Sequence, residues 1–179
     1  MGGTPRVILV LGAARSGKSL YAREIGEAFQ GKRLFVATAQ ALDREMAERI
    51  ENHRRERGDL WETREEPLEI ARVLSEAQDR YSVVLIDCLT LWVSNLLMTY
   101  REDKDGMEER LEGLVGSLKT TKIPVVLVSN EVGWGVVPEN PLARSFRDLA
   151  GRLNQRVAQA ADRVVLMVAG IPLVVKDKG

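Results

Sequence analysis

The stretch from Gly12 to Ser19, Gly-Ala-Ala-Arg-Ser-Gly-Lys-Ser, constrains the fold of this chain more than any other segment. An apolar run at 7–11 precedes it, and an amphipathic pattern typical of a helix follows it at 18–29. A glycine-rich loop between a strand and a helix directs backbone N–H groups at phosphate oxygens, and the helix N-terminus adds partial positive charge. A glycine-rich turn that arose by chance is the alternative. The order of strand, loop and helix favours a phosphate-binding loop.

Each residue type in this loop has a role in that interpretation. Lys18 would reach the β- and γ-phosphates of a nucleotide, and the Ser19 hydroxyl would bind Mg²⁺. The nucleotide-binding candidates of the loop are Gly12, Ala13, Ala14, Arg15, Ser16, Gly17, Lys18 and Ser19. The motif predicts nucleotide binding, but it does not say what is done with the nucleotide.

Short apolar strands alternate with longer helical patterns along the rest of the chain. Strands are expected at 7–11, 34–37, 83–87, 125–129, 164–168 and 173–176. Helices are expected at 18–29, 44–57, 67–77, 89–100, 107–119 and 143–161, with Asp43 as a cap and Pro67 in a first turn. Several strands are apolar throughout, which is typical of parallel strands covered on both faces. The sequence predicts one α/β domain over residues 1–179, a mostly parallel sheet flanked by helices with the P-loop NTPase (RecA-like) architecture. An antiparallel hairpin of the last two strands at the sheet edge is left open.

Composition excludes several classes of protein. The 26 Lys and Arg residues balance the 26 Asp and Glu residues, whereas binders of nucleic acid or of anionic membranes favour a basic excess. Cys88 is the single cysteine, so neither an intrachain disulfide nor a CxxC metal site is expected. No apolar run approaches the roughly 18 residues of a membrane span. We therefore expect no nucleic acid, no membrane insertion and a cytoplasmic location.

Polar residues close two of the apolar strands. Asp87 ends the strand at 83–87, where it would hold Mg²⁺ directly or through water; its alternative role is to cap the helix that follows. Ser129-Asn130-Glu131 ends another strand, in a position to sense a γ-phosphate or to face an acceptor, and a plain turn is the alternative. The run at 130–133 is not the NKxD pattern with which signalling GTPases recognise guanine, so a switch-type GTPase is disfavoured.

His53 is the only histidine of the chain, in the charged helical pattern at 44–57. Met46, Ile50 and His53 share one helical stripe, which favours a histidine at the core boundary that one hydrogen bond satisfies. The competing hypothesis is catalytic. A neutral imidazole can attack phosphorus, and the arginines within 54–57 suit the oxygens of a transferring group. From the residues alone, the structural interpretation of His53 is favoured.

Four segments carry a family resemblance: GAARSGKS, LFVATAQALDREMAERIENHRRER, VVLIDCLTLWVSNLL and VSNEVGWGVVPENPLARSFRDLAGRLNQRVAQAADRVVLMVAGIPLVVK. In this order they resemble the bifunctional adenosylcobinamide kinase/adenosylcobinamide-phosphate guanylyltransferase family of cobalamin synthesis. The likeness runs from Val7 to Lys176. The segments NEVGWGVVPENPLAR and DCLTLW are far more specific than the phosphate loop.

The resemblance implies an enzyme with two activities. A nucleoside triphosphate, ATP or GTP, first phosphorylates the aminopropanol hydroxyl of adenosylcobinamide. GTP then guanylylates an enzyme histidine with loss of pyrophosphate, and GMP passes to the new phosphate to give adenosylcobinamide-GDP. The carrier histidine of the family maps onto His53, which reverses the preference stated above. The expected catalytic residues are His53 and Lys18, and Ser19 and Asp87 are the expected ligands of Mg²⁺.

The resemblance also implies nucleotide contacts outside the phosphate loop. They map onto Ala37, Thr38, Ala39, Arg54, Arg55, Glu56, Arg57, Glu65 and Asp87. One departure is that the family's loop usually opens Gly-Gly, whereas Ala13 follows Gly12 here. A homo-oligomer, a trimer in the family, is implied, and the Trp134 loop is a candidate rim for the flat corrinoid. The rival functions are another P-loop small-molecule kinase with a structural His53, and a non-enzymatic nucleotide-binding switch module.

Overall fold

The computed structural model describes residues 5–41 and 44–178. In one helix it describes the backbone but not the side chains of Glu45, Met46, Arg49, Asn52, His53, Glu56 and Arg57. The proposed cap Asp43 and the side-chain stripe of Met46 and His53 therefore lie outside the described residues. No helix in the described ranges is long and apolar enough to cross a membrane.

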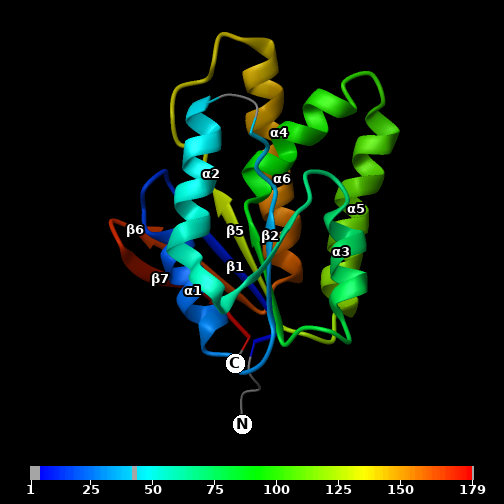
Figure 1. Cartoon of the computed structure of the whole chain (residues 1–179). Helices are drawn as coiled ribbons and strands as arrows, with labels where there is room; N and C mark the ends of the chain where they lie inside the picture. Colours follow the sequence, from blue (N-terminus) through cyan, green and yellow to red (C-terminus); the bar gives the residue numbers. More distant parts are fainter. Residues whose placement is uncertain (1–4, 42–43, 179) are drawn as a thin grey trace.

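In the described part of the chain, seven strands form a single sheet in the order β3-β2-β4-β5-β1-β6-β7. The strands are β1 (Val7–Gly12), β2 (Arg33–Ala37), β3 (Glu62–Glu65), β4 (Val83–Asp87), β5 (Val125–Asn130), β6 (Arg163–Val168) and β7 (Ile171–Asp177). All neighbouring pairs are parallel except β6 and β7, which are antiparallel. The predicted mostly parallel sheet is confirmed, and the hairpin that the sequence left open is present at one edge (Figure 1).

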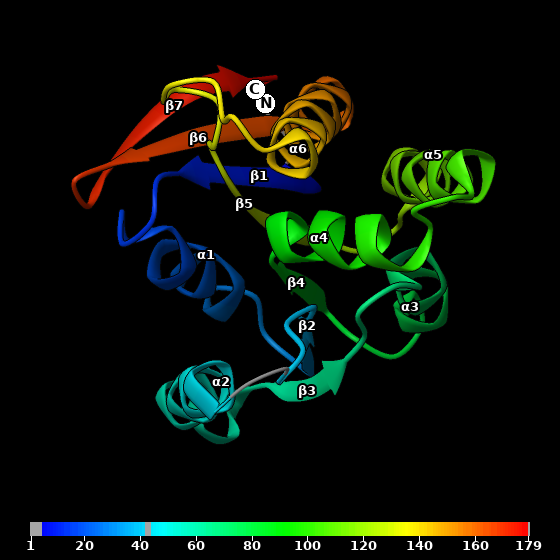
Figure 2. The same ribbon diagram turned by 90° about the horizontal axis from the view of Figure 1, so that it is seen from above.

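Helices cover both faces of this sheet. They are α1 (Lys18–Glu27), α2 (Arg44–Arg57), α3 (Ile70–Ala77), α4 (Leu89–Thr99), α5 (Lys104–Thr120) and α6 (Pro141–Ala160). Figure 2 shows α1 on one face and α4 and α6 on the other, with α3 and α5 outside α4. Helix α2 stands at the periphery, near the edge strand β3 and on the same side of the sheet as α1 (Figure 2).

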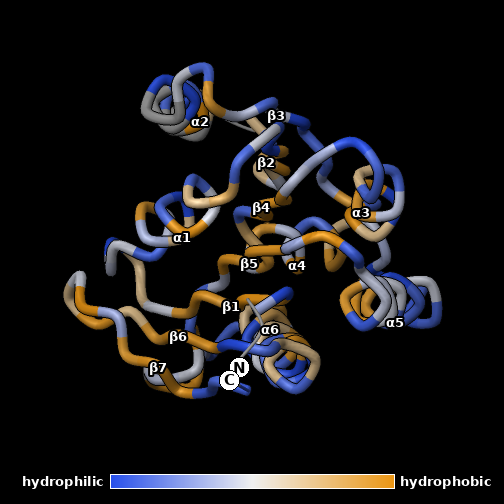
Figure 3. Tube along the Cα trace, turned by 90° about the horizontal axis from the view of Figure 1, so that it is seen from below, coloured by the Kyte–Doolittle hydropathy of each residue, from blue (hydrophilic) through white to orange (hydrophobic). Residues whose placement is uncertain are grey.

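The central strands are apolar except near their carboxyl ends, because both of their faces are buried. In β1, Leu9 joins the core under α3 to α6, whereas Ile8 and Val10 join the core under α1. Leu9 and Val10 are fully inaccessible to solvent. Figure 3 shows hydrophobic residues along the central strands and hydrophilic ones on the outer helix surfaces. The continuous apolar runs of the sequence are thus explained by burial on two faces.

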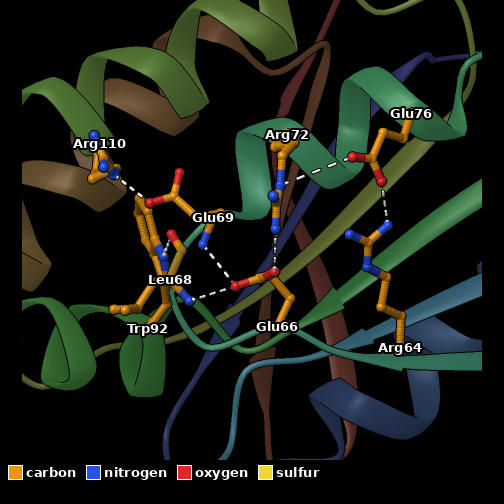
Figure 4. A network of polar contacts seen from close by, with 8 residues as sticks. All are labelled: Arg64, Glu66, Leu68, Glu69, Arg72, Glu76, Trp92 and Arg110. Atoms are coloured by element: carbon orange, nitrogen blue, oxygen red, sulfur yellow. Dashed lines mark hydrogen bonds and ion pairs between the residues drawn. The ribbon is translucent and has the colours of Figure 1, made fainter.

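One helix begins later than the sequence predicts. Helix α3 starts at Ile70 and not at Pro67, because Glu66 closes a turn around the proline (Figure 4). Oε1 of Glu66 accepts from the backbone N–H groups of Leu68 at 3.1 Å and of Glu69 at 2.9 Å. This turn is tied to the core, because Trp92 Nε1 donates to the Leu68 carbonyl oxygen at 2.8 Å. Pro67 therefore lies in the turn that precedes the helix.

Another helix begins earlier than predicted. Asp103 caps α5, and its Oδ1 accepts from the Gly106 backbone N–H at 2.9 Å. The cap lets the polar segment 101–106, predicted as a solvated connection, supply the first turn of α5.

The edge strand β3 has no counterpart among the predicted strands. It is short and polar, and it pairs in parallel with β2. It nevertheless brings Glu65 beside the carboxyl end of β2, because Ala37 and Glu65 are partners in the pairing register.

Candidate nucleotide-binding site

The phosphate loop joins β1 to α1 with two residues in the left-handed region of backbone space. Arg15 has φ 57° and Gly17 has φ 89°. Glycine adopts this conformation without a steric penalty, which explains the second glycine of the motif. Gly12 meets a different demand: a Cβ atom there would overlap Ser16 Oγ and lie 2.9 Å from the Met167 carbonyl oxygen. Both motif glycines therefore fit the geometry of this loop.

Lys18 lies folded over the loop that it follows. Its side-chain Nζ donates to the carbonyl oxygen of Ala13 at 2.9 Å, and the residue is only 9% exposed. Burial lowers the pKa of the Lys18 ammonium, and the charges of Asp87 and Cys88 act in the opposite direction. Lys18 is therefore held against the loop in a largely buried position.

The ends of β2 and β4 are joined through Thr38, which is fully buried. Its Oγ1 donates to the Cys88 carbonyl oxygen at 2.7 Å and accepts from the Cys88 backbone N–H at 2.8 Å. The Thr38 backbone N–H donates to the Asp87 carbonyl oxygen at 3.3 Å. These three hydrogen bonds of Thr38 fix the backbone of Asp87 and Cys88. They therefore hold in place the end of the strand that carries the Asp87 carboxylate.

Cys88 is a buried structural residue. Burial, with a further contribution from the Asp87 charge, raises the pKa of its thiol to about 11. The thiolate is the reactive form of cysteine, so this thiol is unreactive near neutral pH. Cys88 thus serves as a small buried residue of the core, 7% exposed.

The carboxyl edge of the sheet gathers most of the site candidates. Ala37 is the register partner of both Glu65 and Asp87, so the ends of β3, β2 and β4 lie side by side. On the other side of β4, Asn130 at the end of β5 is the register partner of Gly12. The phosphate loop, the 37–39 segment and the two carboxylates therefore share one edge, where α/β folds bind ligands.

The candidates on α2 are placed less completely. Arg54 and Arg55 are exposed, and Arg55 Nε pairs with Glu51 Oε1 at 3.0 Å on the same helix. His53 lies in this helix, but its side chain, like those of Glu56 and Arg57, is outside the described part of the chain.

The loop and β4 offer a donor set that fits Mg²⁺. A hydroxyl at Ser19 and a carboxylate at Asp87 are the oxygen ligands that this ion prefers. Within the described residues, the Ser16 Oγ is buried without a hydrogen-bond partner, so the loop retains polar capacity for a bound group. The Mg²⁺ ligands Ser19 and Asp87 and the phosphate loop would then form one continuous site.

A group of hydrogen-bonded polar side chains links the end of β5 to α6, and the sequence did not predict it. Ser129 Oγ donates to Asn154 Oδ1 at 2.7 Å, and Asn154 Nδ2 donates to Glu131 Oε1 at 3.3 Å. Ser129 and Asn154 are 1% and 6% exposed. A polar residue in the middle of the amphipathic pattern at 143–161 was the available signal, but no rule of spacing relates it to residue 129.

Fold and site together define a P-loop nucleoside-triphosphate-binding protein. Among solved structures, a RadB recombinase matches 89% of this chain and 73% of its own with TM-score 0.53 and 16% identity. A type III secretion system ATPase of pathogenic bacteria matches 91% of this chain and 51% of its own, with TM-score 0.53 and 10% identity. At such identities these likenesses show the fold alone, and they confirm the RecA-like architecture.

Sequence comparison identifies the family. The model of the family described as cobinamide kinase / cobinamide phosphate guanyltransferase matches residues 8–175. The bifunctional adenosylcobalamin biosynthesis protein CobU of Escherichia coli (strain K12) is 44% identical over 182 residues, covering 95% of this chain and 99% of that protein. The protein CobP of Pseudomonas aeruginosa, named in the same way, is 42% identical over 170 residues, with 95% and 97% covered. The chain belongs to the cobinamide kinase / cobinamide phosphate guanyltransferase family.

Proposed function

We propose that this chain catalyses two successive reactions on a corrinoid. It phosphorylates the hydroxyl of adenosylcobinamide with a nucleoside triphosphate, and it then transfers GMP from GTP to the new phosphate through a guanylyl group on His53. One combination of features supports the proposal. A member of this family has a well-formed phosphate loop, and its single histidine lies on the helix that follows β2 at the same sheet edge.

In the kinase stage, the protein positions a triphosphate and stabilises charge. The backbone N–H groups of the loop and the Lys18 ammonium contact phosphate oxygens, and Ser19 with Asp87 holds the metal. Mg²⁺, when bound, supplies charge neutralisation on the β- and γ-phosphates. The low exposure of Lys18 supports this role, because electrostatic interactions are stronger in a site that excludes water.

In the transferase stage, a nitrogen lone pair of His53 attacks the α-phosphorus of GTP. A P–N bond forms, the bond to the bridging oxygen breaks, and pyrophosphate leaves. An oxygen of the corrinoid phosphate then attacks the same phosphorus and releases the imidazole. Among the charged groups of α2, the guanidinium groups of Arg54 and Arg55 are suited to the oxygens of the transferring group. No other imidazole exists in the chain to carry GMP.

The proposal also includes Mg²⁺ as cofactor, ATP and GTP as substrates, a homo-oligomeric state and a cytoplasmic location. The corrinoid is expected to dock near the loop after β5, where Trp134 is 77% exposed. A broad apolar side chain at the rim of the carboxyl edge suits a flat macrocycle.

The test uses GTP labelled at the α-phosphate. After incubation with Mg²⁺ and denaturation, label should remain on the protein, survive alkali, be released by acid and be absent from His53→Ala. GTP labelled at the γ-phosphate should leave no label, which distinguishes guanylylation from phosphorylation. His53→Ala should retain kinase turnover. If no label is retained where GTP binding is demonstrated, a plain P-loop kinase with a structural histidine replaces the proposal.

A further inference from the structure

Glu131 follows the strand that lies between the phosphate loop and Asp87. The strand order places β5 between β4 and β1, and Asn130 at its end is the register partner of Gly12. The Glu131 backbone N–H donates to the Gly12 carbonyl oxygen at 3.2 Å. Glu131 is therefore attached to the first residue of the phosphate loop and lies on the edge where a phosphoryl group would be transferred.

A buried polar chain holds the Glu131 side chain. Ser129 Oγ donates to Asn154 Oδ1 at 2.7 Å, which leaves the Asn154 amide nitrogen to donate to Glu131 Oε1 at 3.3 Å and to the Asn130 carbonyl oxygen at 3.2 Å. Thr90 Oγ1 extends the chain, since it accepts from the Asn130 backbone N–H at 2.8 Å. Burying polar side chains is unfavourable unless they are hydrogen-bonded, and a surface turn needs none of them. The arrangement instead fixes the position of one carboxylate.

The partner of this carboxylate is neutral. Among the side chains that the structure describes, no lysine or arginine lies within ion-pairing distance of Glu131, and its hydrogen-bond donor is an amide. Glu131 is only partly exposed, and among the described residues its Oε1 is the carboxylate oxygen that accepts a hydrogen bond from a side chain. In the same described part, the Oδ1 atom of neighbouring Asn130 is buried without a hydrogen-bond partner. The end of β5 thus presents acceptor oxygens beside the phosphate loop.

We infer that Glu131 is the general base of the kinase stage, an assignment that rests on the proposed function. The acceptor hydroxyl gives its proton to the Glu131 carboxylate as its oxygen forms a bond to the γ-phosphorus. The bond from the γ-phosphorus to the β–γ bridging oxygen breaks, and the nucleoside diphosphate leaves with that electron pair. Asn154 is a positioning residue, because it acts by orienting Glu131.

The two stages differ in their need for a base. A hydroxyl must lose a proton when it attacks phosphorus. An imidazole attacks with the lone pair of an unprotonated nitrogen, and a phosphate attacks with an oxygen that is already anionic. Removal of the Glu131 carboxylate should therefore slow the first reaction and spare the second. A residue that merely supports the shared phosphate loop would affect both.

The experiment measures both stages in Glu131→Gln, with Glu112→Gln, an exposed glutamate of α5 outside the site, as the matched control. Cobinamide and ATP report the kinase, and α-labelled GTP reports guanylylation of the protein. Glu131→Gln should lower the kinase kcat by roughly 10²–10⁴-fold, the usual contribution of a general base, with the KM for ATP nearly unchanged. Guanylylation and GTP affinity should match the wild type, and Glu112→Gln should leave both stages intact.

Two outcomes would overturn the assignment of Glu131 as the base. A Glu131→Gln kinase within about tenfold of wild type, a loss well below the usual contribution of a base, would overturn the assignment. Equal losses in both stages would overturn it too, since Glu131 would then support the loop as a whole. Glu131→Asp, which keeps the charge on a shorter side chain, should give an intermediate kinase rate and serves if the glutamine variant folds poorly. A wild-type protein with kinase turnover but no guanylyl adduct would refute the proposed second stage while leaving the Glu131 comparison valid.

Discussion

The phosphate loop and helix α2 are stabilised in different ways. The loop is enclosed: Lys18 is 9% exposed and bonded to Ala13, and Thr38 fixes the adjoining strand ends from a fully buried position. On α2 the described charged side chains face solvent, and Arg44 pairs with Glu48 on the helix itself, with side chains 94% and 64% exposed. Figure 2 shows α2 at the margin of the molecule. The phosphate-binding part of the site is thus built into the core, whereas the helix that carries His53 depends largely on local interactions.

This difference indicates a division of labour. Electrostatic stabilisation of a triphosphate requires groups that are already oriented before the reaction, which the enclosed loop supplies. A nucleotidyl carrier must meet two partners, first GTP and then the corrinoid phosphate, so a peripheral helix suits it better than a buried strand. Three substitutions test this difference between the phosphate loop and α2.

The largest effect is expected for Lys18→Ala. If one loop serves both stages, the loss of its ammonium should reduce kinase turnover and guanylylation together, each by roughly 10²–10³-fold, as for removal of one transition-state donor. Kinase assays and α-label retention measure the two losses, and Lys32→Ala, an exposed lysine outside the site, is the control. An intact kinase with no guanylylation would show that the two stages use separate phosphate sites.

A smaller effect is expected for Thr38→Val, which keeps the shape of the side chain and removes the hydroxyl. Both backbone groups of Cys88 would lose their Thr38 partner in a fully buried position. The Cys88 carbonyl oxygen keeps the Trp92 backbone N–H at 3.2 Å, so the Cys88 N–H is the group left unsatisfied. An unsatisfied buried group costs about 1–3 kcal/mol, and urea unfolding should show a loss of about this size. Thr38→Ser should restore most of the stability, and a valine variant as stable as the wild type would contradict the role of the hydroxyl.

The smallest effect is expected on α2. Glu51→Ala removes the exposed pair with Arg55, whose side chain is 74% exposed against 51% for Glu51. Exposed pairs at this helical spacing contribute about 0.3–0.5 kcal/mol, so the free energy of unfolding should change by no more than that. Urea titration at low and high salt measures it. A destabilisation above about 1 kcal/mol would mean that α2 is coupled to the core more strongly than an exposed pair allows.

The sequence predicted those parts of the fold that rest on local patterns. Buried strands such as β4 are apolar up to the polar residue that ends them, and α2 has the bounds that its charge pattern predicts. Strand β3 was not predicted, because its four polar residues show no hydrophobic periodicity. Its position depends on pairing with β2 at the sheet edge. The predicted start of α3 was wrong. Proline favours the first turn of a helix, but the hydrogen bonds of the Glu66 side chain hold Pro67 in the turn before α3.

Prediction of the site followed the same division. The motif at 12–19 is contiguous, and so it could be read from the sequence alone. The contacts of Thr38 with Cys88, and of Ser129 with Asn154, join residues 50 and 25 positions apart. The pairing of β2 with β4 brings the first two together, and the second contact joins strand β5 to helix α6. Family resemblance named Thr38 as part of the site, but its bonds to the backbone next to Asp87 became visible only in the folded chain.

The hairpin of β6 and β7 has a consequence for where this protein can be cut or extended. The turn of the hairpin reaches the phosphate loop, where the Gly170 backbone N–H donates to the Ser16 carbonyl oxygen at 3.0 Å. A minimal domain that stopped after β6 would therefore take away a support of the loop as well as an edge strand. The chain ends lie at the opposite end of the sheet strands (Figure 1), so an affinity tag or fluorophore fused after Lys178 would sit far from the nucleotide.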